Sequence, residues 1–164
     1  MAAVSAVYEP TGIELTKAPW AETESAEYGA CRLSLNGAQI VYRVAKTTPT
    51  KVGQFVTIWK RPDPGGPIAP LDSADGVALV IIHVSDGARS GQFIFDKSTL
   101  IKRGVMSVDG KGGKRAIRVY PPWTTPTAKD AISTQRWQLG CFLPLHQTAG
   151  TSAIERLFAS ILPG

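Results

Sequence analysis

The sequence has 164 residues, of which 43% are apolar and 19% charged, with a formal net charge of +5 at pH 7. A chain of this length buries roughly 70% of its unfolded surface, so one domain needs no disulfide or structural metal for stability. It contains no run of about 18 apolar residues, and its apolar start lacks the basic residues of a signal peptide, so we expect neither a membrane span nor export.

The first clear elements along the chain form a hairpin. Residues 1–22 carry little regular patterning, so we expect a loosely ordered arm there and a single domain over residues 23–164. The Asn-Gly dipeptide at 36–37 is the strongest short signal for a two-residue hairpin turn. It joins the alternating segments 31–35 and 39–44, so two antiparallel strands should begin the domain.

Four further strands are expected in the middle of the chain. Residues 53–60 are rich in β-branched and aromatic side chains, which favour strands. The stretch 77–84 is almost continuously apolar and predicts a central strand buried on both faces. Segment 91–95 is a further strand, with Phe93 and Phe95 on one face and Gln92 and Ile94 on the other, and segment 115–120 alternates between two faces. Because short turns separate most of these segments, we expect mainly antiparallel pairing.

Two helices are expected in the C-terminal part. A hydroxyl residue followed by proline at 125–126 is a typical helix start, and the helix should end at Pro144. Its apolar stripe would consist of Ala128, Ile132, Leu139 and Leu143. A second helix begins with the capping-box residues Ser152 and Glu155. Its apolar face would consist of Ile154, Leu157, Phe158 and Ile161. The sequence therefore predicts an α+β fold in which C-terminal helices cover one face of a mainly antiparallel twisted sheet.

The cysteines and histidines do not indicate a metal or redox site. Cys31 and Cys141 lie far apart and belong to no C-x-x-C pair, which is typical of unreactive thiols in a reducing cytoplasm. His83 and His146 have no recognised metal-ligand spacing, and His83 lies within an apolar run. We therefore expect a cytoplasmic protein with no metal and no cofactor.

Charge is distributed unevenly along the chain. Residues 1–42 contain two basic and five acidic residues, whereas residues 43–118 contain thirteen basic and six acidic residues. The first basic cluster consists of Arg43, Lys46, Thr47, Thr48, Thr50, Lys51 and Gln54. Its ammonium, hydroxyl and loop N–H groups suit phosphate oxygens. The same composition also suits a solvated hairpin loop, so both interpretations stay open.

A second basic cluster lies in a glycine-rich stretch. It consists of Lys111, Lys114, Arg115 and Arg118. No Walker or G-x-G-x-x-G pattern accompanies it, so a standard nucleotide-binding loop is not predicted. A flexible basic loop that runs into a strand suits the backbone of DNA or RNA, and the alternative is again a solvated surface.

An aromatic group with two glutamines follows the second cluster. It consists of Tyr120, Trp123, Gln135, Trp137 and Gln138. Exposed aromatic rings next to basic residues stack on bases. Aromatic residues at a strand end more often pack a helix onto a sheet, and we favour packing here.

A degenerate nuclease site is the main enzymatic alternative. A helix Glu, a strand-end Asp and an acidic-x-Lys pair on the next strand form the core of PD-(D/E)xK nucleases, which bind Mg²⁺. The weak catalytic candidates here are Glu27, Asp75 and Gln92. Gln92 replaces the second acid and Ile94 stands in place of the lysine, which argues against cleavage. No nucleophile triad and no zinc-hydrolase motif is present.

Seven short sequence strings between residues 23 and 143 are more distinctive than the hydrophobic patterns that a sheet protein needs. They are Ser25–Cys31, Leu35–Gly37, Arg43–Pro49, Lys51–Arg61, Gly91–Phe95, Gly113–Trp123 and Thr134–Gln138. These strings resemble the MepB family, and the chain departs from it at Asp96, where the family usually has proline. The resemblance implies a bacterial protein from a family named after a gene beside a multidrug efflux pump. It implies no particular activity, cofactor or substrate. The polar strings coincide with both basic clusters, which favours an anion-binding face.

The leading hypothesis is a nucleic-acid-binding domain that contacts the phosphate backbone of DNA or RNA. The expected ligand-binding residues are Lys46, Thr47, Thr50, Lys51, Gln54, Lys60, Lys114, Arg115 and Arg118. The first alternative is a Mg²⁺-dependent, nuclease-like enzyme. The second alternative is a module that binds a small anion or an acidic protein. The leading hypothesis depends on whether the two basic clusters share one face.

Overall fold

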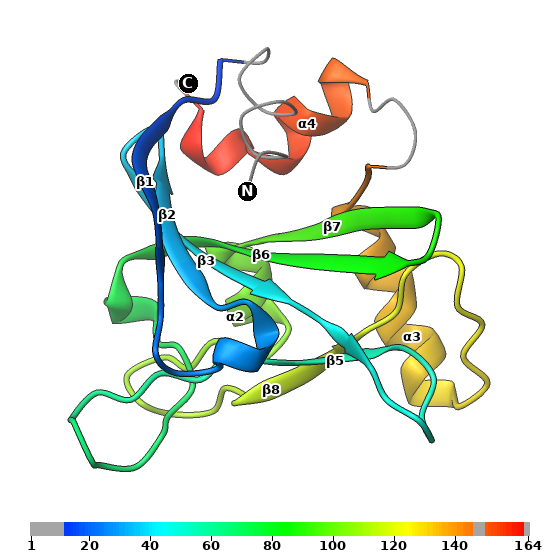
Figure 1. Cartoon of the computed structure of the whole chain (residues 1–164), viewed down its shortest axis with the longest axis horizontal. Coiled ribbons are helices and arrows are strands. Elements are labelled where there is room, and N and C mark those ends of the chain that lie inside the picture. Colours follow the sequence, from blue (N-terminus) through cyan, green and yellow to red (C-terminus); the bar gives the residue numbers. More distant parts are fainter. Residues whose placement is uncertain (1–11, 146–149, 163–164) are drawn as a thin grey trace.

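The structure, a computed structural model, describes residues 12–145 and 150–162. It contains two β-sheets that share a core, with α-helices packed around them (Figure 1). The predicted α+β class is confirmed. None of the described helices is long and apolar enough to cross a membrane.

The larger sheet has six strands and the smaller sheet three. In spatial order the larger sheet contains β1 (Leu15–Ala21), β2 (Cys31–Leu35), β3 (Ala38–Val44), β6 (Val77–Asp86), β7 (Arg89–Asp96) and β9 (Phe142–Pro144). The smaller sheet contains β4 (Lys46–Thr47), β5 (Gln54–Thr57) and β8 (Ala116–Val119). β3 and β6 pair in parallel, and the other strand pairs are antiparallel, which confirms the mainly antiparallel prediction.

The helices are short and lie between or after the strands. Within residues 12–145 and 150–162, the α-helices are α2 (Lys97–Lys102), α3 (Lys129–Gln138) and α4 (Thr151–Leu157). The 3-10 helices are η2 (Ala26–Tyr28), η3 (Ser73–Asp75), η4 (Leu139–Cys141) and η5 (Ala159–Ile161).

The predicted hairpin and central strand are confirmed. Asn36 and Gly37 have φ values of 50° and 78°, the double positive φ of a type I′ turn, and they connect β2 to β3. β6 lies between β3 and β7, and most of its side chains are buried. The side chains of a central strand point alternately to the two faces of its sheet, so β6 contributes to a core on each face.

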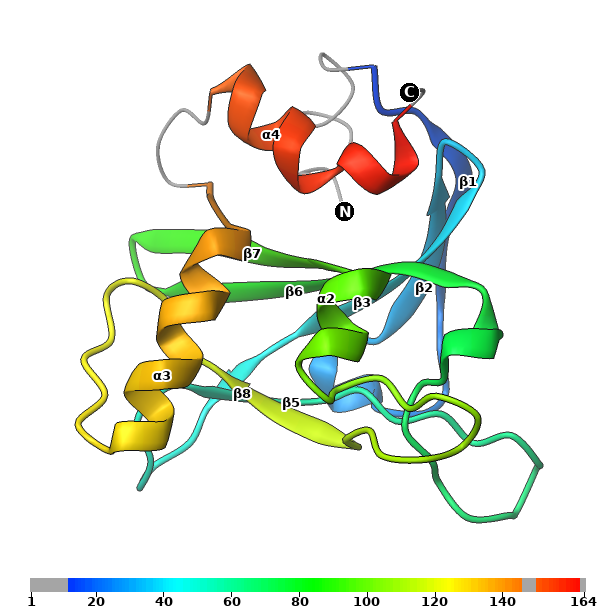
Figure 2. The same ribbon diagram turned by 180° about the vertical axis from the view of Figure 1, so that it is seen from behind.

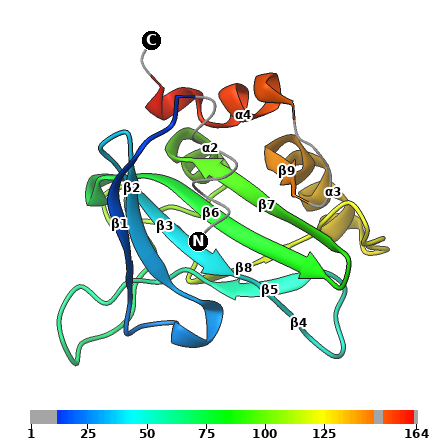
Figure 3. The same ribbon diagram turned by 45° about the horizontal axis from the view of Figure 1, so that its top comes forward.

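Two apolar cores lie on opposite faces of the larger sheet. Val80 and Phe93 point toward the smaller sheet, where they pack with Val56 and Val119. The other core, which includes Leu79 and Ile94, packs under α4. Figure 3 shows β6 and β7 running between these two layers.

The helices α3 and α4 cover different faces, so the prediction that both cover one face is wrong. Trp137 of α3 packs against the core shared by the two sheets, whereas Ile154 and Leu157 of α4 belong to the other core. Figure 1 accordingly shows α4 above the larger sheet and α3 below it. The predicted apolar face of α4 is confirmed, although Gly150 is the N-cap and no side chain caps the helix.

The predicted extent of the helix before Pro144 is wrong. α3 ends at Gln138, and Leu143 lies in β9. Two residues of the expected apolar stripe, Ile132 and Leu139, are 40% and 39% exposed, whereas the polar Gln138 is 1% exposed. The stripe failed because α3 docks through Trp137 and a hydrogen-bonded glutamine, which a search for apolar periodicity does not find.

Part of the expected N-terminal arm is a strand. Leu15–Ala21 forms β1 and pairs with β2, with two irregularities in its register. Most of its side chains are exposed, which explains why the sequence shows little alternation there. Residues 1–11 of the predicted arm lie outside the described residues.

Candidate anion-binding pocket

A pocket of about 440 Å³ lies where β8, α3 and the end of α2 meet. Figure 2 shows the side of the molecule on which these three elements lie. The pocket is lined by Lys51, Phe55, Arg103, Val105, Lys114, Ala116, Ile117, Arg118, Tyr120, Thr134, Trp137 and Gln138. Four of these residues are basic, and none of the described residues in the lining is acidic.

Three separate parts of the chain supply the basic side chains. Lys51 comes from the loop before β5, and Arg103 is the C-cap of α2. Lys114 and Arg118 come from β8 and the loop before it. The backbone N–H of Lys114 donates to the carbonyl of Val105 at 2.8 Å, which fastens this loop beside the end of α2. Packing of distant segments therefore creates the cationic pocket.

The four basic residues of the pocket have no acidic partner among the described residues. The ion pairs between described residues involve other basic side chains, namely Arg32, Arg43, Lys60, Arg61 and Arg89. Unpaired cations that converge in one concave site create a positive potential. Such a site attracts an anion.

Both arginines of the pocket lie against aromatic rings. The guanidinium of Arg118 is 5.6 Å from the ring centroid of Phe55, and that of Arg103 is 5.1 Å from Trp137. Arg118 Nη2 also donates to Thr48 Oγ1 at 2.8 Å. These contacts orient the two guanidinium groups, and an oriented guanidinium binds phosphate or carboxylate oxygens in bidentate fashion.

Gln138 closes one side of the pocket. β8 is the last strand of the smaller sheet, and the edge of β8 that does not pair with β5 faces α3. Gln138 accepts a hydrogen bond from the Tyr120 N–H and donates one to the Arg118 carbonyl, both at 2.9 Å. The buried side-chain amide therefore takes the place of a neighbouring strand at this point.

The aromatic residues of this region serve mainly in packing. Trp137 lies 5.5 Å from Phe95 in the core, and Trp123 lies 5.9 Å from Phe142. The interpretation as packing residues is therefore confirmed for both tryptophans. Gln135 Nε2 donates to the carbonyls of Pro121 and Thr124, so the predicted glutamines are structural as well.

Lys46 of the first predicted basic cluster and Arg118 of the second lie on the same face of the smaller sheet, whereas Arg43 of the first cluster is buried. Lys46 lies directly opposite Phe55 in the β4–β5 pair, and Phe55 lies directly opposite Arg118 in the β5–β8 pair. Residues directly opposite in antiparallel strands point to the same face. Lys46 Nζ is also 5.1 Å from the ring of Tyr28, which packs edge-on against Phe55. A row of cations and aromatic rings thus extends from the pocket across this face.

Three of the predicted ligand-binding residues line the pocket, namely Lys51, Lys114 and Arg118. Lys46, Thr50 and Arg115 are exposed outside its lining. Thr47 is also outside and accepts a hydrogen bond from Gln54.

Two predicted residues have structural roles instead, and most residues of the pocket lining were not predicted as ligand-binding residues. Gln54 is buried and donates to Thr47 and to the Ser85 carbonyl. Lys60 forms an ion pair with Asp75 at 2.6 Å. Arg103 and Trp137 were not predicted as site residues, because only the packing of α2 against α3 brings them together.

The weak nuclease candidates do not form one site. Asp75 already accepts hydrogen bonds from Lys60 Nζ and from the backbone N–H of Asp72. It precedes the start of β6, whereas Gln92 pairs with His83 near the other end of that strand. Six residues of β6 separate these positions, which corresponds to roughly 20 Å. Glu27 is exposed in η2.

No metal site is evident in the part of the chain that the structure describes. No group of three or more His, Cys, Asp or Glu side chains there is placed to hold a metal ion. His146 lies outside the described residues. Burial raises the pKa of the Cys31 thiol and of the Cys141 thiol, as expected for thiols of low reactivity.

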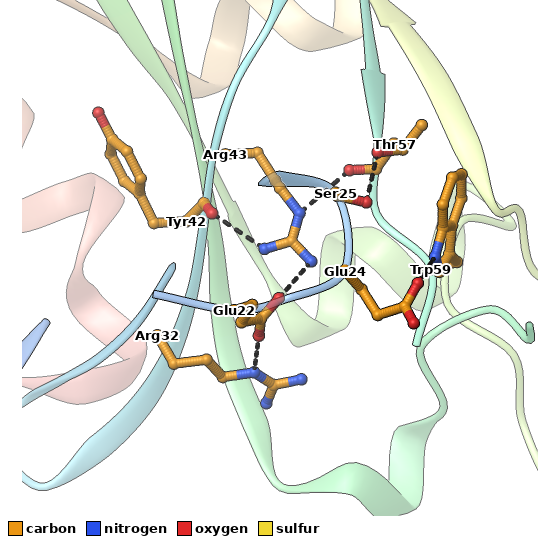
Figure 4. A network of polar contacts seen from close by, with 8 residues as sticks. All are labelled: Glu22, Glu24, Ser25, Arg32, Tyr42, Arg43, Thr57 and Trp59. Atoms are coloured by element: carbon orange, nitrogen blue, oxygen red, sulfur yellow. Dashed lines mark hydrogen bonds and ion pairs between the residues drawn. The ribbon is translucent and has the colours of Figure 1, made fainter. Parts of the chain in front are cut away.

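A buried polar network explains other polar residues in the specific strings (Figure 4). Arg43 forms an ion pair with Glu22 at 2.8 Å and donates to the carbonyls of Thr57 and Tyr42. Ser25, whose φ is 57°, shares a 2.6 Å hydrogen bond with the Thr57 hydroxyl. The network fastens the segment that contains Glu22 and Ser25 to both sheets, so its role is structural.

Comparison with known proteins is consistent with this arrangement. A family model described as MepB-like matches residues 22–144, which include the whole lining of the pocket. The crystal structure of MepB superposes on the chain with a TM-score of 0.77. The two sequences are 30% identical over 90% of this chain and 97% of MepB. No curated protein matches the chain.

Proposed function

Because the chain belongs to the MepB-like family and carries four unpaired cations in one pocket, we propose that it binds nucleic acid through phosphate groups. The convergence of Lys51, Arg103, Lys114 and Arg118 carries this proposal. Phosphate contacts by lysine and arginine supply most of the affinity of non-specific nucleic-acid binding. The pocket would hold one phosphate-bearing part of the ligand.

The row of cations and rings outside the pocket favours a chain-like ligand. Lys46, Phe55 and Arg118 lie side by side across three strands of the smaller sheet. A small anion would need only the pocket, whereas a single strand of DNA or RNA follows a basic groove that carries aromatic rings. The same surface therefore supports contacts with neighbouring nucleotides.

A matched pair of double variants tests the proposal. Arg103→Gln with Lys114→Gln removes two charges from the pocket, whereas Arg136→Gln with Lys129→Gln removes two exposed charges of α3 outside its lining. Affinity for labelled single-stranded DNA and RNA should be measured by fluorescence anisotropy over a salt series. The first pair should weaken binding strongly and flatten the salt dependence, by about 0.7 in the logarithmic slope per lost phosphate contact.

Two results would contradict the proposal. The first is an equal loss of affinity in both double variants, which would mean that only net charge matters. The second is the absence of binding to any nucleic acid at low salt. In the second case, a thermal shift with a small anion would favour the alternative of a metabolite site, since the volume of the pocket lies within the range of roughly 300–1,000 Å³ typical of such sites.

The nuclease alternative has less support. It requires Asp75 and Gln92 to act on one metal ion, and the β6–β7 register separates them. The binding assay, run with Mg²⁺ and followed by gel analysis of the nucleic acid, would reveal cleavage. Intact nucleic acid is the expected outcome.

A further inference from the structure

We infer that the pocket selects a phosphorylated strand end over an internal phosphodiester. This inference rests on the proposed function and adds the chemical class of the group that enters the pocket. Four observations support it: the charge of the pocket, its two arginines, the hydrogen bonds that join α3 to β8, and its aromatic rings.

The charge of the pocket exceeds what one internal phosphate balances. Four cations line a single site of about 440 Å³, and no described residue of the lining is acidic. An internal phosphodiester carries one negative charge, whereas a terminal phosphate monoester carries roughly −1.5 to −2 at pH 7 and offers three free oxygens. A monoester therefore matches the convergent cations better.

The two arginines provide the geometry for such a group. Arg103 and Arg118 each lie over an aromatic ring, with the guanidinium 5.1 Å and 5.6 Å from the ring centroid. Arg118 donates from Nη2 to Thr48 Oγ1 and from Nη1 to the Val52 carbonyl, which orients its guanidinium. The remaining N–H groups are available to oxygen acceptors. The extra oxygen of a monoester can use donors that a diester leaves unpaired.

Hydrogen bonds between α3 and β8 prevent a strand from passing between these two elements. Gln138 bridges α3 and β8 with two hydrogen bonds of 2.9 Å, to Arg118 and Tyr120. Gln135, on the same helix, ties α3 to the carbonyls of Pro121 and Thr124. A nucleic-acid strand that reaches the pocket cannot continue between α3 and β8, and a strand end satisfies this constraint.

The aromatic rings of the pocket distinguish a nucleotide from a free anion. Phe55 and Trp137 are both half-buried and line the pocket beside the basic residues. Inorganic phosphate gains nothing from these groups, whereas the sugar or base of a terminal nucleotide can pack on them. Inorganic phosphate should therefore compete weakly.

The test compares strand ends on one oligonucleotide sequence of roughly ten nucleotides. Single-stranded DNA and RNA would carry an internal fluorophore and a 5′-phosphate, a 3′-phosphate or hydroxyl groups at both ends. Competition assays would use inorganic phosphate and a mononucleotide. We expect the oligonucleotide with one of the two phosphorylated ends to bind about 10-fold more tightly than the oligonucleotide with hydroxyl groups at both ends. Comparison of the 5′-phosphate and 3′-phosphate oligonucleotides identifies the end that the pocket prefers.

The variants separate this selectivity from general affinity. Arg103→Gln with Lys114→Gln should remove the preference for a phosphorylated end, whereas Arg136→Gln with Lys129→Gln should keep it. Arg118→Lys preserves the charge but not the bidentate geometry, and it should reduce the preference several-fold.

Two outcomes would overturn the inference in distinguishable ways. Equal affinity for all three end structures, with binding that still depends on Arg103 and Lys114, would refute end selection and leave the proposed function intact. The absence of binding by every oligonucleotide would refute both. Competition by inorganic phosphate as effective as that by a mononucleotide would also refute end selection, because the pocket would then recognise only an anion.

Discussion

Arg43 and Glu22 form an ion pair of 2.8 Å in which the side chain of Arg43 is 1% exposed. Burial lowers the pKa of Arg43, and the adjacent Glu22 carboxylate opposes this shift. The guanidinium also donates to the carbonyls of Thr57 in β5 and Tyr42 in β3. One side chain therefore links the segment before η2 to both sheets and keeps the smaller sheet in place.

Substitution of Glu22 should destabilise the protein strongly. Glu22→Gln leaves the Arg43 guanidinium buried without its counter-charge, and such losses cost about 3–5 kcal/mol. Urea denaturation should show this decrease in the free energy of unfolding. Arg32→Gln is the matched control, because Arg32 pairs with the same carboxylate but is 24% exposed; it should cost about 1 kcal/mol or less. Similar costs for the two variants would mean that Arg43 does not depend on Glu22.

Loss of the Gln138 side chain should affect both stability and the pocket. Gln138→Ala leaves the Tyr120 N–H and the Arg118 carbonyl without partners at the edge of β8. The expected cost is about 1–3 kcal/mol for each group that becomes unpaired in a buried position.

The control for this variant lies on the same helix. Arg136→Ala changes an exposed residue of α3 outside the pocket, and it should leave the free energy of unfolding within about 0.5 kcal/mol of the wild-type value. Urea denaturation of both variants gives the comparison. Equal stability of Gln138→Ala and Arg136→Ala would show that water replaces the amide without cost.

Gly53 should not accept a side chain. Its φ is +84°, and a Cβ there would lie 2.7 Å from Tyr120 Cδ1 and 2.9 Å from the Val119 carbonyl oxygen. Gly65→Ala is a matched control, because Gly65 has a φ of +76° and open space around its Cβ position.

Thermal unfolding should separate backbone strain from steric overlap. Gly65→Ala should cost about 1–2 kcal/mol from the left-handed backbone alone. Gly53→Ala should cost about 1–3 kcal/mol more, because β8 or the Tyr120 ring must move. If both variants melt at the same temperature, the contact between Gly53 and Tyr120 is not tight.

Local signals in the sequence predicted those elements that local chemistry determines. The Asn36-Gly37 turn requires positive φ at both positions, and the strand 77–84 is apolar because both of its faces are buried. The long side chains of Lys114 and Arg118 were identified by their charge, and both line the pocket.

The rest of the pocket depends on contacts between distant segments. Arg103 and Trp137 meet only because α2 and α3 pack on the same core, so no pattern around either residue predicts their 5.1 Å contact. The helix prediction from Ile132 failed for a related reason. α3 is held by the polar Gln138, whose hydrogen bonds to β8 leave no trace in apolar periodicity.

His83 should make the stability of the protein depend on pH near neutrality. Its side chain lies on β6 beside Val44 and Gln92, and its Nδ1 is buried with no hydrogen-bond partner in the described part of the chain. Burial lowers the pKa of His83 from its usual 6.5. The folded state therefore binds this proton less readily than the unfolded state does.

The direction of the pH effect follows from that difference. Above pH 6.5, His83 is neutral in both states and stability does not depend on it. As the pH falls through this value, the unfolded state is protonated first, and the free energy of unfolding decreases until the lowered folded-state pKa is reached. His83→Gln removes the titration of His83, and the two proteins are otherwise identical. Urea denaturation between about pH 7.5 and pH 5 should therefore show a larger loss for the wild type than for His83→Gln. Parallel losses would mean that His83 is solvated enough to titrate normally in the folded state.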